Sequence, residues 1–382
     1  MTPVTPSLND SRPPVASTLP PLRIGKYTAR VPIVQGGMGV RISGANLAGA
    51  VANAGGIGII SAVGLGFNSP YYDARNRKGK FFEANRLALI DELALARRIS
   101  PDGIVGVNIM VAARDFDTLA QTAAEHGANL IVAGAGLPMN LPSLTQDYPD
   151  VALAPIISST RAAKLIYRKW KRQGRVPDAF IVENPRTAGG HLGASAEELD
   201  DRQLDTEYVV PELVEYVKTE LQEDIRVIAA GGVWDRSDID RFLSLGANGV
   251  QMGTRFITTH ECDADLRYKE AHLKARSEDV VLVPSPVGLP GRAIANDFAR
   301  RAIEGTLPER QPCIANCLKA CKCREKGETY CILQALDNAS RGNVENGLIF
   351  SGSNAGRATA LVSVADLVAE LARPVDCGEA RR

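Results

Sequence analysis

Hydrophobic residues along this chain fall into short runs separated by longer segments of mixed polarity. Eight of the runs are rich in Val, Ile and Ala and are nearly continuously apolar, as parallel strands covered on both faces are. The expected strands are Val31–Met38, Gly56–Val63, Ile104–Val111, Asn129–Gly136, Val151–Ser158, Ala179–Pro185, Ile225–Val233 and Gly249–Ile257.

Most of the segments between these runs show apolar residues at helical spacing. The expected helices are Ser43–Ala54, Glu83–Arg98, Asp115–His126, Thr160–Gln173, Val209–Leu221, Arg236–Leu245 and Ala264–Ser277. The Pro-rich stretch Leu137–Asp150 has room for a short helix only. Strands that alternate with helices form parallel sheets. Eight of them predict an α/β fold of the closed (β/α)8 type (a TIM barrel), with an open doubly wound sheet as the alternative.

The remaining segments complete the expected organisation. Residues 1–21 carry six prolines and no apolar stretch of the signal-peptide kind, so a disordered leader is expected there. The barrel is expected over residues 22–280, with Gly64–Asn85 as a long loop on its binding face. Residues 281–357 are expected to form an inserted lid, a C-terminal helical appendage that contains cysteines. Residues 358–382 are expected to form a closing helix, over 358–373, and a tail.

The 382 residues include 44 Lys plus Arg and 44 Asp plus Glu, so the formal net charge is zero. This balance argues against a general attraction to nucleic acid or to anionic membranes. The chain contains no run of about 18 consecutive apolar residues, which is the length needed to span a bilayer. We therefore expect a cytoplasmic protein without nucleic-acid or membrane partners, for which a homodimer is one possible assembly.

Glycine and small polar residues gather where the expected strands end. Examples are Gly36-Gly37, Gly189-Gly190, Gly231-Gly232 and Gly253-Thr254. In a barrel this edge is the rim of the active site, where glycine lets the backbone approach a ligand closely. The pairs after the last two strands lie where barrels commonly bind phosphate. The alternative is that these glycines only shape tight turns.

A histidine and an asparagine stand out among the candidate side chains. His191 follows two glycines after the sixth strand, so it would lie at the barrel mouth, where an imidazole can donate a hydrogen bond or exchange a proton. His126 is expected to cap a helix end, and His260 and His272 to lie at the surface. Asn108 is polar inside an apolar strand, and its amide needs partners either in the core or in a ligand with donors and acceptors.

Several motifs, taken in order, resemble those of nitronate monooxygenases, formerly called 2-nitropropane dioxygenases. They are Pro32–Gly39 (PIVQGGMG), Leu47–Val51, Gly55–Gly58, Val107–Met110 (VNIM), Ala188–Gly193 (AGGHLG), Ala229–Gly232 (AAGG) and Gln251–Phe256 (QMGTRF). The resemblance covers Pro32–Ile257, and Gly347–Arg357 is similar to the family's closing segment. The same superfamily includes flavin-dependent enoyl-acyl-carrier-protein reductases and NADH:quinone reductases.

The resemblance implies a barrel that binds flavin mononucleotide (FMN), with His191 as the catalytic residue. The residues that it implies for FMN are Met38 (through its backbone), Asn108, Asn184 (in place of the family's usual Gln), Gly189, Gly232, Gln251, Met252, Gly253 and Thr254, the last five at the phosphate.

The sequence departs from the family pattern just before the histidine. Family members often carry Gln-Gly-x-Glu-Ala-Gly-Gly-His, whereas residues 184–191 read NPRTAGGH. An acidic residue is lost and Arg186 is added, which hints at an anionic substrate.

Five of the seven cysteines crowd into one segment outside the family core: Cys313, Cys317, Cys321, Cys323 and Cys331. Three interpretations are open: free, partly buried thiols in a helical lid, a metal site or iron–sulfur cluster, and a thiol–disulfide switch. The basic residues Lys319, Lys322, Arg324 and Lys326 are expected to lower the pKa values of these thiols.

The function that the family resemblance implies is oxidation of alkyl nitronates by O2, with FMN, to a carbonyl compound and nitrite. The first alternative is an NAD(P)H-dependent FMN reductase of enoyl thioesters or quinones, which the motifs alone do not separate from it. A non-catalytic flavin- or phosphate-binding sensor is the second.

Overall fold

Eight parallel strands close into a barrel in the computed structural model, which describes residues 18–72, 77–308, 313, 315–328 and 330–374. Around the barrel the strands follow the order β10-β11-β3-β4-β5-β6-β7-β8. Their bounds are β3 Ile33–Gln35, β4 Ile57–Ser61, β5 Ile104–Met110, β6 Leu130–Gly134, β7 Ala152–Ile157, β8 Ala179–Glu183, β10 Arg226–Ala230 and β11 Gly249–Met252. The expected (β/α)8 barrel is confirmed, and each expected strand contains one of these strands.

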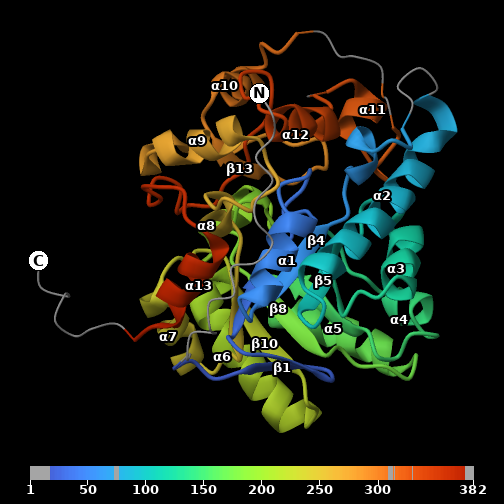
Figure 1. Cartoon of the computed structure of the whole chain (residues 1–382), viewed down its shortest axis with the longest axis vertical. Helices are drawn as coiled ribbons and strands as arrows, with labels where there is room; N and C mark the ends of the chain where they lie inside the picture. Colours follow the sequence, from blue (N-terminus) through green and yellow to red (C-terminus); the bar gives the residue numbers. More distant parts are fainter. Residues whose placement is uncertain (1–17, 73–76, 309–312, 314, 329, 375–382) are drawn as a thin grey trace, which may run out of the picture.

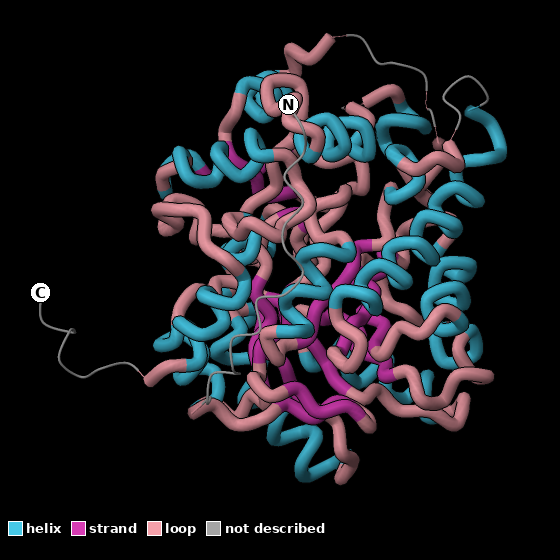
Figure 2. Tube along the Cα trace, in the orientation of Figure 1, coloured by secondary structure: helices cyan, strands magenta, loops and turns pink. Residues whose placement is uncertain are grey.

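Helices surround the barrel (Figures 1 and 2) because each buries one apolar stripe against the strands. In α5, for example, Ala163, Ile166 and Trp170 are buried at helical spacing. The surrounding helices are α1 Ala45–Asn53, α2 Arg77–Ile99, α3 Phe116–Glu125, α4 Leu141–Leu144, α5 Thr160–Lys171, α6 Thr206–Tyr216, α7 Arg236–Ser244 and α13 Val364–Ala372. The expected closing helix is α13, which packs against α1 and α7 and so joins the two ends of the ring.

The barrel interior is closed at one end only. Its inward-facing side chains, such as Val132 and Ile181, form one apolar cluster. Leu22 and Ile24 belong to the same cluster and come from a hairpin, β1 (Leu22–Ile24) and β2 (Tyr27–Ala29). This hairpin was not predicted. It covers the amino-terminal ends of the strands (Figure 1).

A second hydrophobic core lies over the carboxyl ends of the strands. It includes Val40 and Phe81 from the barrel loops together with Phe298, Leu318 and Leu333 from the region after the barrel. The elements of that region are β12 Val280–Val283, β13 Gly291–Ile294, α10 Asp297–Glu304, α11 Lys322–Lys326 and α12 Ile332–Ser340, and α9 (Leu266–Lys274) precedes them.

The region after the barrel was expected to be helical, but it also contains strands. Strands β12 and β13 form an antiparallel hairpin, and β13 also pairs with β9 (Gly190–His191). The glycine-rich loop that carries the histidine is therefore the third strand of a small sheet built largely from the appendage. Sequence patterns missed this pairing because β9 is only two residues long.

Several expected boundaries are wrong. Helix α2 begins at Arg77, six residues before the expected start, so the loop from Gly64 is shorter than expected. The last predicted strand ends at Met252, and the apolar residues after it form a short helix, α8 (Thr254–Ile257). A short apolar run alone does not distinguish a strand from a buried helix. Helix α6 passes through Pro211 and is followed by a π-helical turn over Val217–Leu221.

None of the helices in the described part of the chain is both long enough and apolar enough to cross a membrane. The expected leader lies mostly outside the described residues, but Thr18 is placed and its hydroxyl donates to the carbonyl oxygen of Ala372 (3.2 Å).

Candidate active site at the barrel mouth

A cavity of about 250 Å³ opens at the carboxyl ends of the barrel strands; we call it the mouth cavity. Its floor is the last layer of inward-facing residues. Side chains alternate along a strand, so Ile59 and Ile181 of the interior cluster are followed two residues later by Ser61 and Glu183. The floor residues are Gly36, Ser61, Asn108, Gly134, Ile156, Glu183, Ala230 and Gln251.

His191 lines the mouth cavity and is held by the appendage. Its Nε2 lies 2.8 Å from the Oγ of Ser285, and its ring meets the ring of Phe350 edge-on at 5.1 Å between centroids. The backbone N–H of Val287 donates to the same Ser285 Oγ (3.4 Å) and so helps to hold the serine beside the ring. Burial lowers the pKa of His191 to about 4. At neutral pH the imidazole is therefore uncharged and fixed in direction.

Glu183 is a second ionisable group in the mouth cavity. It is the final residue of β8 and pairs with Ala230 of β10. Burial raises the pKa of its carboxyl to about 7. No hydrogen bond or ion pair holds this carboxyl among the described residues.

The turns after β10 and β11 allow a ligand to approach the backbone closely. Gly231 and Gly232 both have positive φ, +85° and +76°, a conformation that strains any residue with a Cβ. The segment around Gly352 crosses these turns. The backbone N–H of Gly352 donates to Thr254 Oγ1 (2.9 Å), and Asn354 Nδ2 donates to the Gly232 carbonyl (2.9 Å). The two strand ends and the C-terminal segment thus form one wall.

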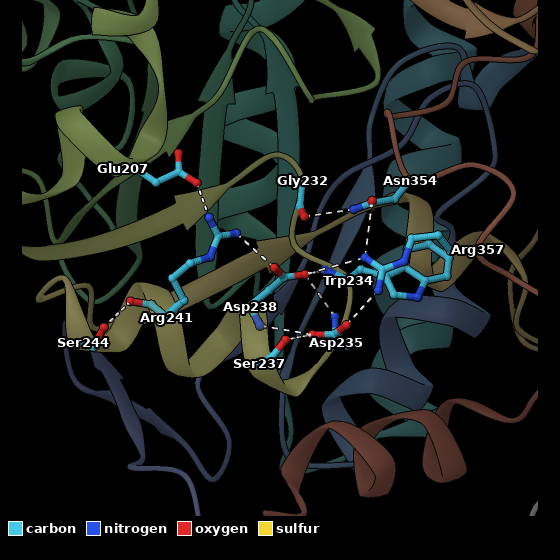
Figure 3. Close-up of polar contacts among 10 residues, drawn as sticks. All are labelled: Glu207, Gly232, Trp234, Asp235, Ser237, Asp238, Arg241, Ser244, Asn354 and Arg357. Atoms are coloured by element: carbon cyan, nitrogen blue, oxygen red, sulfur yellow. Dashed lines mark hydrogen bonds and ion pairs between the residues drawn. The ribbon is translucent and has the colours of Figure 1, made fainter. Parts of the chain in front are cut away.

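A polar network supports this wall from behind (Figure 3). Arg357 pairs with Asp235 (2.7 Å) and lies over the ring of Trp234, with 5.4 Å between the guanidinium carbon and the ring centroid. The backbone N–H of Trp234 donates to Asp238 (2.9 Å), which also pairs with Arg241 (3.0 Å). The turn after β10 is therefore tied both to α7 and to the segment that carries Asn354.

The first turn of the site is equally tight. A Cβ on Gly37 would lie 2.2 Å from the Cβ of Asn108, so only glycine fits there. The next residue, Met38, has both backbone groups engaged: its N–H donates to Ser43 Oγ (2.8 Å) and its carbonyl accepts from the Ser43 N–H (3.0 Å). A ligand contact through the Met38 backbone has to share these groups.

Two buried polar atoms in the cavity lining have no hydrogen-bond partner among the described residues, namely Gln251 Oε1 and Thr187 Oγ1. An unsatisfied buried polar atom is costly, so each of them indicates a place for a ligand or a water molecule.

Most of the residues singled out from the sequence meet at this cavity. His191, Met38, Asn108, Gly189, Gly232, Gln251, Met252, Gly253 and Thr254 all line it. Asn184 does not. Its amide N–H donates to Asp205 (3.3 Å) and its amide oxygen accepts from the Arg186 N–H (2.9 Å), outside the lining. The inward-facing position at this end of β8 belongs to Glu183.

The expected significance of Arg186 is not supported. Its guanidinium pairs with Asp205 at 2.9 Å and does not line the cavity, so it gives no reason to expect an anionic substrate.

Sequence reasoning missed Glu183, Thr187, Ser285, Phe350 and Asn354. Glu183 had a detectable signal, because it continues the inward-facing series Ala179 and Ile181. Ser285 and Phe350 come from the appendage and had none.

The other histidines divide as follows. His126 occupies the C-cap position of α3 and His260 is exposed, both as expected. The expectation for His272 is wrong: it is 2% exposed, and its Nδ1–H donates to the Tyr268 carbonyl (3.0 Å). Burial lowers the pKa of His272 to about 4. It was misplaced because His272 lies on the buried face of α9, one turn after the buried Tyr268.

The expectation that basic neighbours lower the thiol pKa values is wrong for Cys317 and Cys331. Burial raises the pKa of Cys317 to about 12, and it raises that of Cys331. The Lys319 ammonium donates to the Val111 carbonyl instead (2.8 Å), and Arg324 donates to the Leu318 carbonyl (2.7 Å). Within the described ranges, no three His, Cys, Asp or Glu side chains are arranged to hold a metal ion. The metal or iron–sulfur interpretation is therefore unsupported.

The fold and the cavity define a (β/α)8-barrel enzyme, because barrels of this kind carry their ligand sites at the carboxyl ends of the strands. Residues 21–373 match the family model described as nitronate monooxygenase. The chain belongs to that family of oxidoreductases.

Individual relatives differ in how much of the chain they match. A probable nitronate monooxygenase of Staphylococcus saprophyticus is 34% identical over 127 residues, which are 33% of this chain and 34% of that protein. A (3aS,4S,5R,7aS)-5-hydroxy-7a-methyl-1-oxo-octahydro-1H-indene-4-carboxyl-CoA dehydrogenase of Mycobacterium tuberculosis is 29% identical over 278 residues, 72% of this chain and 66% of that protein. The match thus spans about a third of the first relative and just under two thirds of the second.

Solved structures give the same architecture over most of the chain. FabK from Thermotoga maritima superposes with a TM-score of 0.65 at 26% identity, covering 89% of this chain and 91% of FabK. A nitroalkane oxidase from Streptomyces ansochromogenes gives a TM-score of 0.65 at 19% identity, covering 90% and 95%, and so supports the fold alone.

Proposed function

We propose that this protein is an FMN-dependent oxidoreductase that oxidises alkyl nitronates with O2 to a carbonyl compound and nitrite. The observation that carries the proposal is the mouth cavity itself, which is lined by an uncharged imidazole held at Ser285 and by the polar floor residues Ser61, Asn108 and Gln251. The family match over residues 21–373 supplies the reaction class.

The residues present fit FMN. Gln251 Oε1 and Thr187 Oγ1 are buried acceptors without partners, and a ligand with N–H or O–H donors would satisfy them. The paired glycines after β10 and the start of α8 after β11 offer backbone N–H groups to a phosphate. Met38, Asn108, Gly189, Gly232 and Gln251–Thr254, which all line the cavity, would hold the group. When bound, FMN supplies the electron transfer between the nitronate and O2.

His191 binds the nitronate in this scheme. We assign the ring proton to Nδ1, with Nε2 accepting from the Ser285 hydroxyl, so that Nδ1–H can donate to a nitro oxygen. A neutral donor suits an anion that keeps its charge on those oxygens, and the depressed pKa of His191 keeps the ring neutral over the working range. The second core over the mouth limits water around this contact.

The test is oxygen uptake and nitrite release by the FMN-loaded protein with propyl-2-nitronate as substrate. We expect both signals together, with one nitrite formed for each carbonyl product. Loaded protein that consumes no oxygen with this nitronate, or with propionate-3-nitronate, would exclude the function.

A second candidate is NAD(P)H-dependent reduction of an enoyl thioester or a quinone. The M. tuberculosis relative supports only the thioester part of this candidate, because the printed name of that protein is a carboxyl-CoA dehydrogenase and the match covers 72% of this chain. NADPH consumption that depends on an added enoyl thioester or quinone, without nitrite chemistry, would support this candidate instead.

A further inference from the structure

Two neighbouring helices of the ring, α5 and α6, carry opposite charges on their outer surfaces. Helix α5 and the residue after it present a basic stripe, which consists of Arg161, Arg168 and Arg172. Helix α6 and the π-helical turn after it present an acidic stripe, which consists of Glu212, Glu215 and Glu220. All six residues are exposed, and none of them forms an ion pair with another residue that the structure describes.

The next helix of the ring treats its charges differently. On α7, Arg236 pairs with Asp240 (2.8 Å) and Arg241 with Asp238 (3.0 Å), so opposite charges alternate along one helix. The stripes instead place like charges three or four residues apart on the same helix, an arrangement that destabilises it. Charges separated in this way therefore need an explanation outside the helix itself.

The helix dipole does not provide that explanation. A helix favours negative charge in its first turn and positive charge in its last turn. Arg161, however, lies in the first turn of α5, and Glu220 lies in the π-helical turn that ends at Leu221. Each stripe thus extends to the end of its helix where its charge is unfavourable.

Each stripe is accompanied by an exposed apolar side chain. Leu165 follows Arg161 by one helical turn and is 45% exposed. Tyr208 precedes Glu212 by one turn and is 60% exposed. Large apolar side chains that remain exposed among charged residues are typical of surfaces that contact another protein, and tyrosine is enriched in such contacts.

The two helices have a fixed alignment. They follow the adjacent strands β7 and β8, so they run in the same direction, and they pack against each other. Lys171 pairs with Glu223, which is 52 positions later, and the Lys164 ammonium lies over the ring of Tyr216 at the same separation, 4.5 Å from the centroid. This alignment places Arg161 level with Glu212 and Glu215, and Arg168 level with Glu220.

We propose that this face is the interface of a homodimer, in which the basic stripe of each copy contacts the acidic stripe of the other. The face carries both signs of charge in equal number, so it is complementary to itself, which favours a second copy over a partner of one sign. A twofold axis that runs between the helices and parallel to them places each α5 on the α6 of the other copy. The axis also preserves the alignment along the helices. Arg161 of one copy then contacts Glu212 and Glu215 of the other, and Arg168 contacts Glu220. The inference is independent of the proposed redox chemistry.

The experiment is sedimentation velocity of the full chain over a concentration series. One variant carries Arg161→Glu and Arg168→Glu, and the other carries Glu212→Arg and Glu220→Arg. We expect the wild type to dimerise, and each variant alone to have a dimer Kd at least about 10-fold higher, because like charges then face each other across the interface. The matched control is Arg276→Glu, which reverses an exposed charge elsewhere and should dimerise as the wild type does.

An equimolar mixture of the two variants is the decisive sample. In that mixture every acidic stripe can again face a basic one, in both halves of the interface, so a heterodimer should form with a Kd near the wild-type value. A contact through another face would give no such recovery. Folded variants that do not combine on mixing would therefore overturn the proposal, and so would variants that dimerise alone as tightly as the wild type.

A wild-type measurement covers the case in which a variant does not fold, which urea unfolding would show. Salt screens charges at an interface, so the dimer Kd should rise with ionic strength. A dimer whose Kd does not change with salt, or a wild-type monomer throughout the series, would overturn the proposal. A wild-type monomer that binds heparin or phosphatidylserine vesicles would overturn it too, and would assign the basic stripe to a polyanionic partner.

Discussion

The contact between Gly37 and Asn108 gives a sharp test of how the mouth cavity is built. A Cβ on residue 37 would lie 2.2 Å from the Asn108 Cβ and 2.8 Å from its Cγ. Carbon atoms that are not bonded normally keep about 3.5–4.0 Å apart. The overlap is therefore about 1.5 Å, and it falls on a Cβ atom that cannot swing away.

Neither partner in this contact can yield cheaply. Asn108 belongs to β5, which is paired with β4 at Ser61 and with β6 at Val132. Residue 37 lies between β3 and the turn that Ser43 closes. We expect Gly37→Ala to shift this turn into the cavity, to lower the free energy of unfolding by about 1–3 kcal/mol and to weaken FMN binding.

The assays are urea unfolding and titration with FMN. For the unfolding measurement the matched control is Gly253→Ala, whose Cβ would meet only the Met38 side chain, at an ordinary 3.5 Å from its sulfur and 3.8 Å from its Cγ. That variant should stay within about 1 kcal/mol of wild type. Because neither glycine has a positive φ, backbone strain does not confuse the comparison. A Gly37→Ala protein as stable as Gly253→Ala would refute the packing described for this turn.

Three further predictions follow from single contacts. Ser285→Ala removes the partner of His191 Nε2, and kcat/KM for a nitronate should fall about 5- to 10-fold at unchanged FMN content, since one hydrogen bond contributes about 1 kcal/mol; an unchanged value would show that Ser285 does not orient the ring. Burial lowers the pKa of His272 in the folded protein to about 4, below the ordinary 6.5. Protonation of this histidine therefore favours the unfolded chain. Up to about 3 kcal/mol of the free energy of unfolding is lost as the pH falls from 6.5 to 4. In His272→Gln this part of the acid destabilisation, measured by urea unfolding across that range, should be missing. Arg357→Ala breaks the pair with Asp235 behind the Gly232 turn and should raise the Kd for FMN a few-fold, whereas Arg276→Ala, which breaks an exposed pair with Asp279, should leave that Kd unchanged.

The barrel was predictable from sequence because its physics is local and repeated. Each strand is covered on both faces, so in the sequence it is a short apolar run. Each helix shows in the sequence as apolar residues at helical spacing. The glycines of the rim were predictable for the same reason: the tight approach at Gly37 and the positive φ at Gly232 require them. His191 was found because it stands beside two such glycines.

What the sequence did not reveal depends on contacts between distant segments. Ser285 lies 94 positions from His191, and nothing in its own neighbourhood marks it as a partner. Asn184 is not in the cavity lining, although its position in the motif suggested a ligand contact, and its amide is held by Asp205 and by the Arg186 backbone. The buried state of His272 and the raised thiol pKa of Cys317 depend on how the appendage packs, which no local pattern records.

The central claim is that the mouth cavity holds FMN where a nitronate can reduce it. The most direct measurement is the visible spectrum of the FMN-loaded protein without oxygen, recorded after separate additions of propyl-2-nitronate and of NADPH. We predict that the nitronate bleaches the flavin band and that NADPH leaves it in place. Rapid bleaching by NADPH with no response to the nitronate, or a protein that takes up no FMN, would contradict the account.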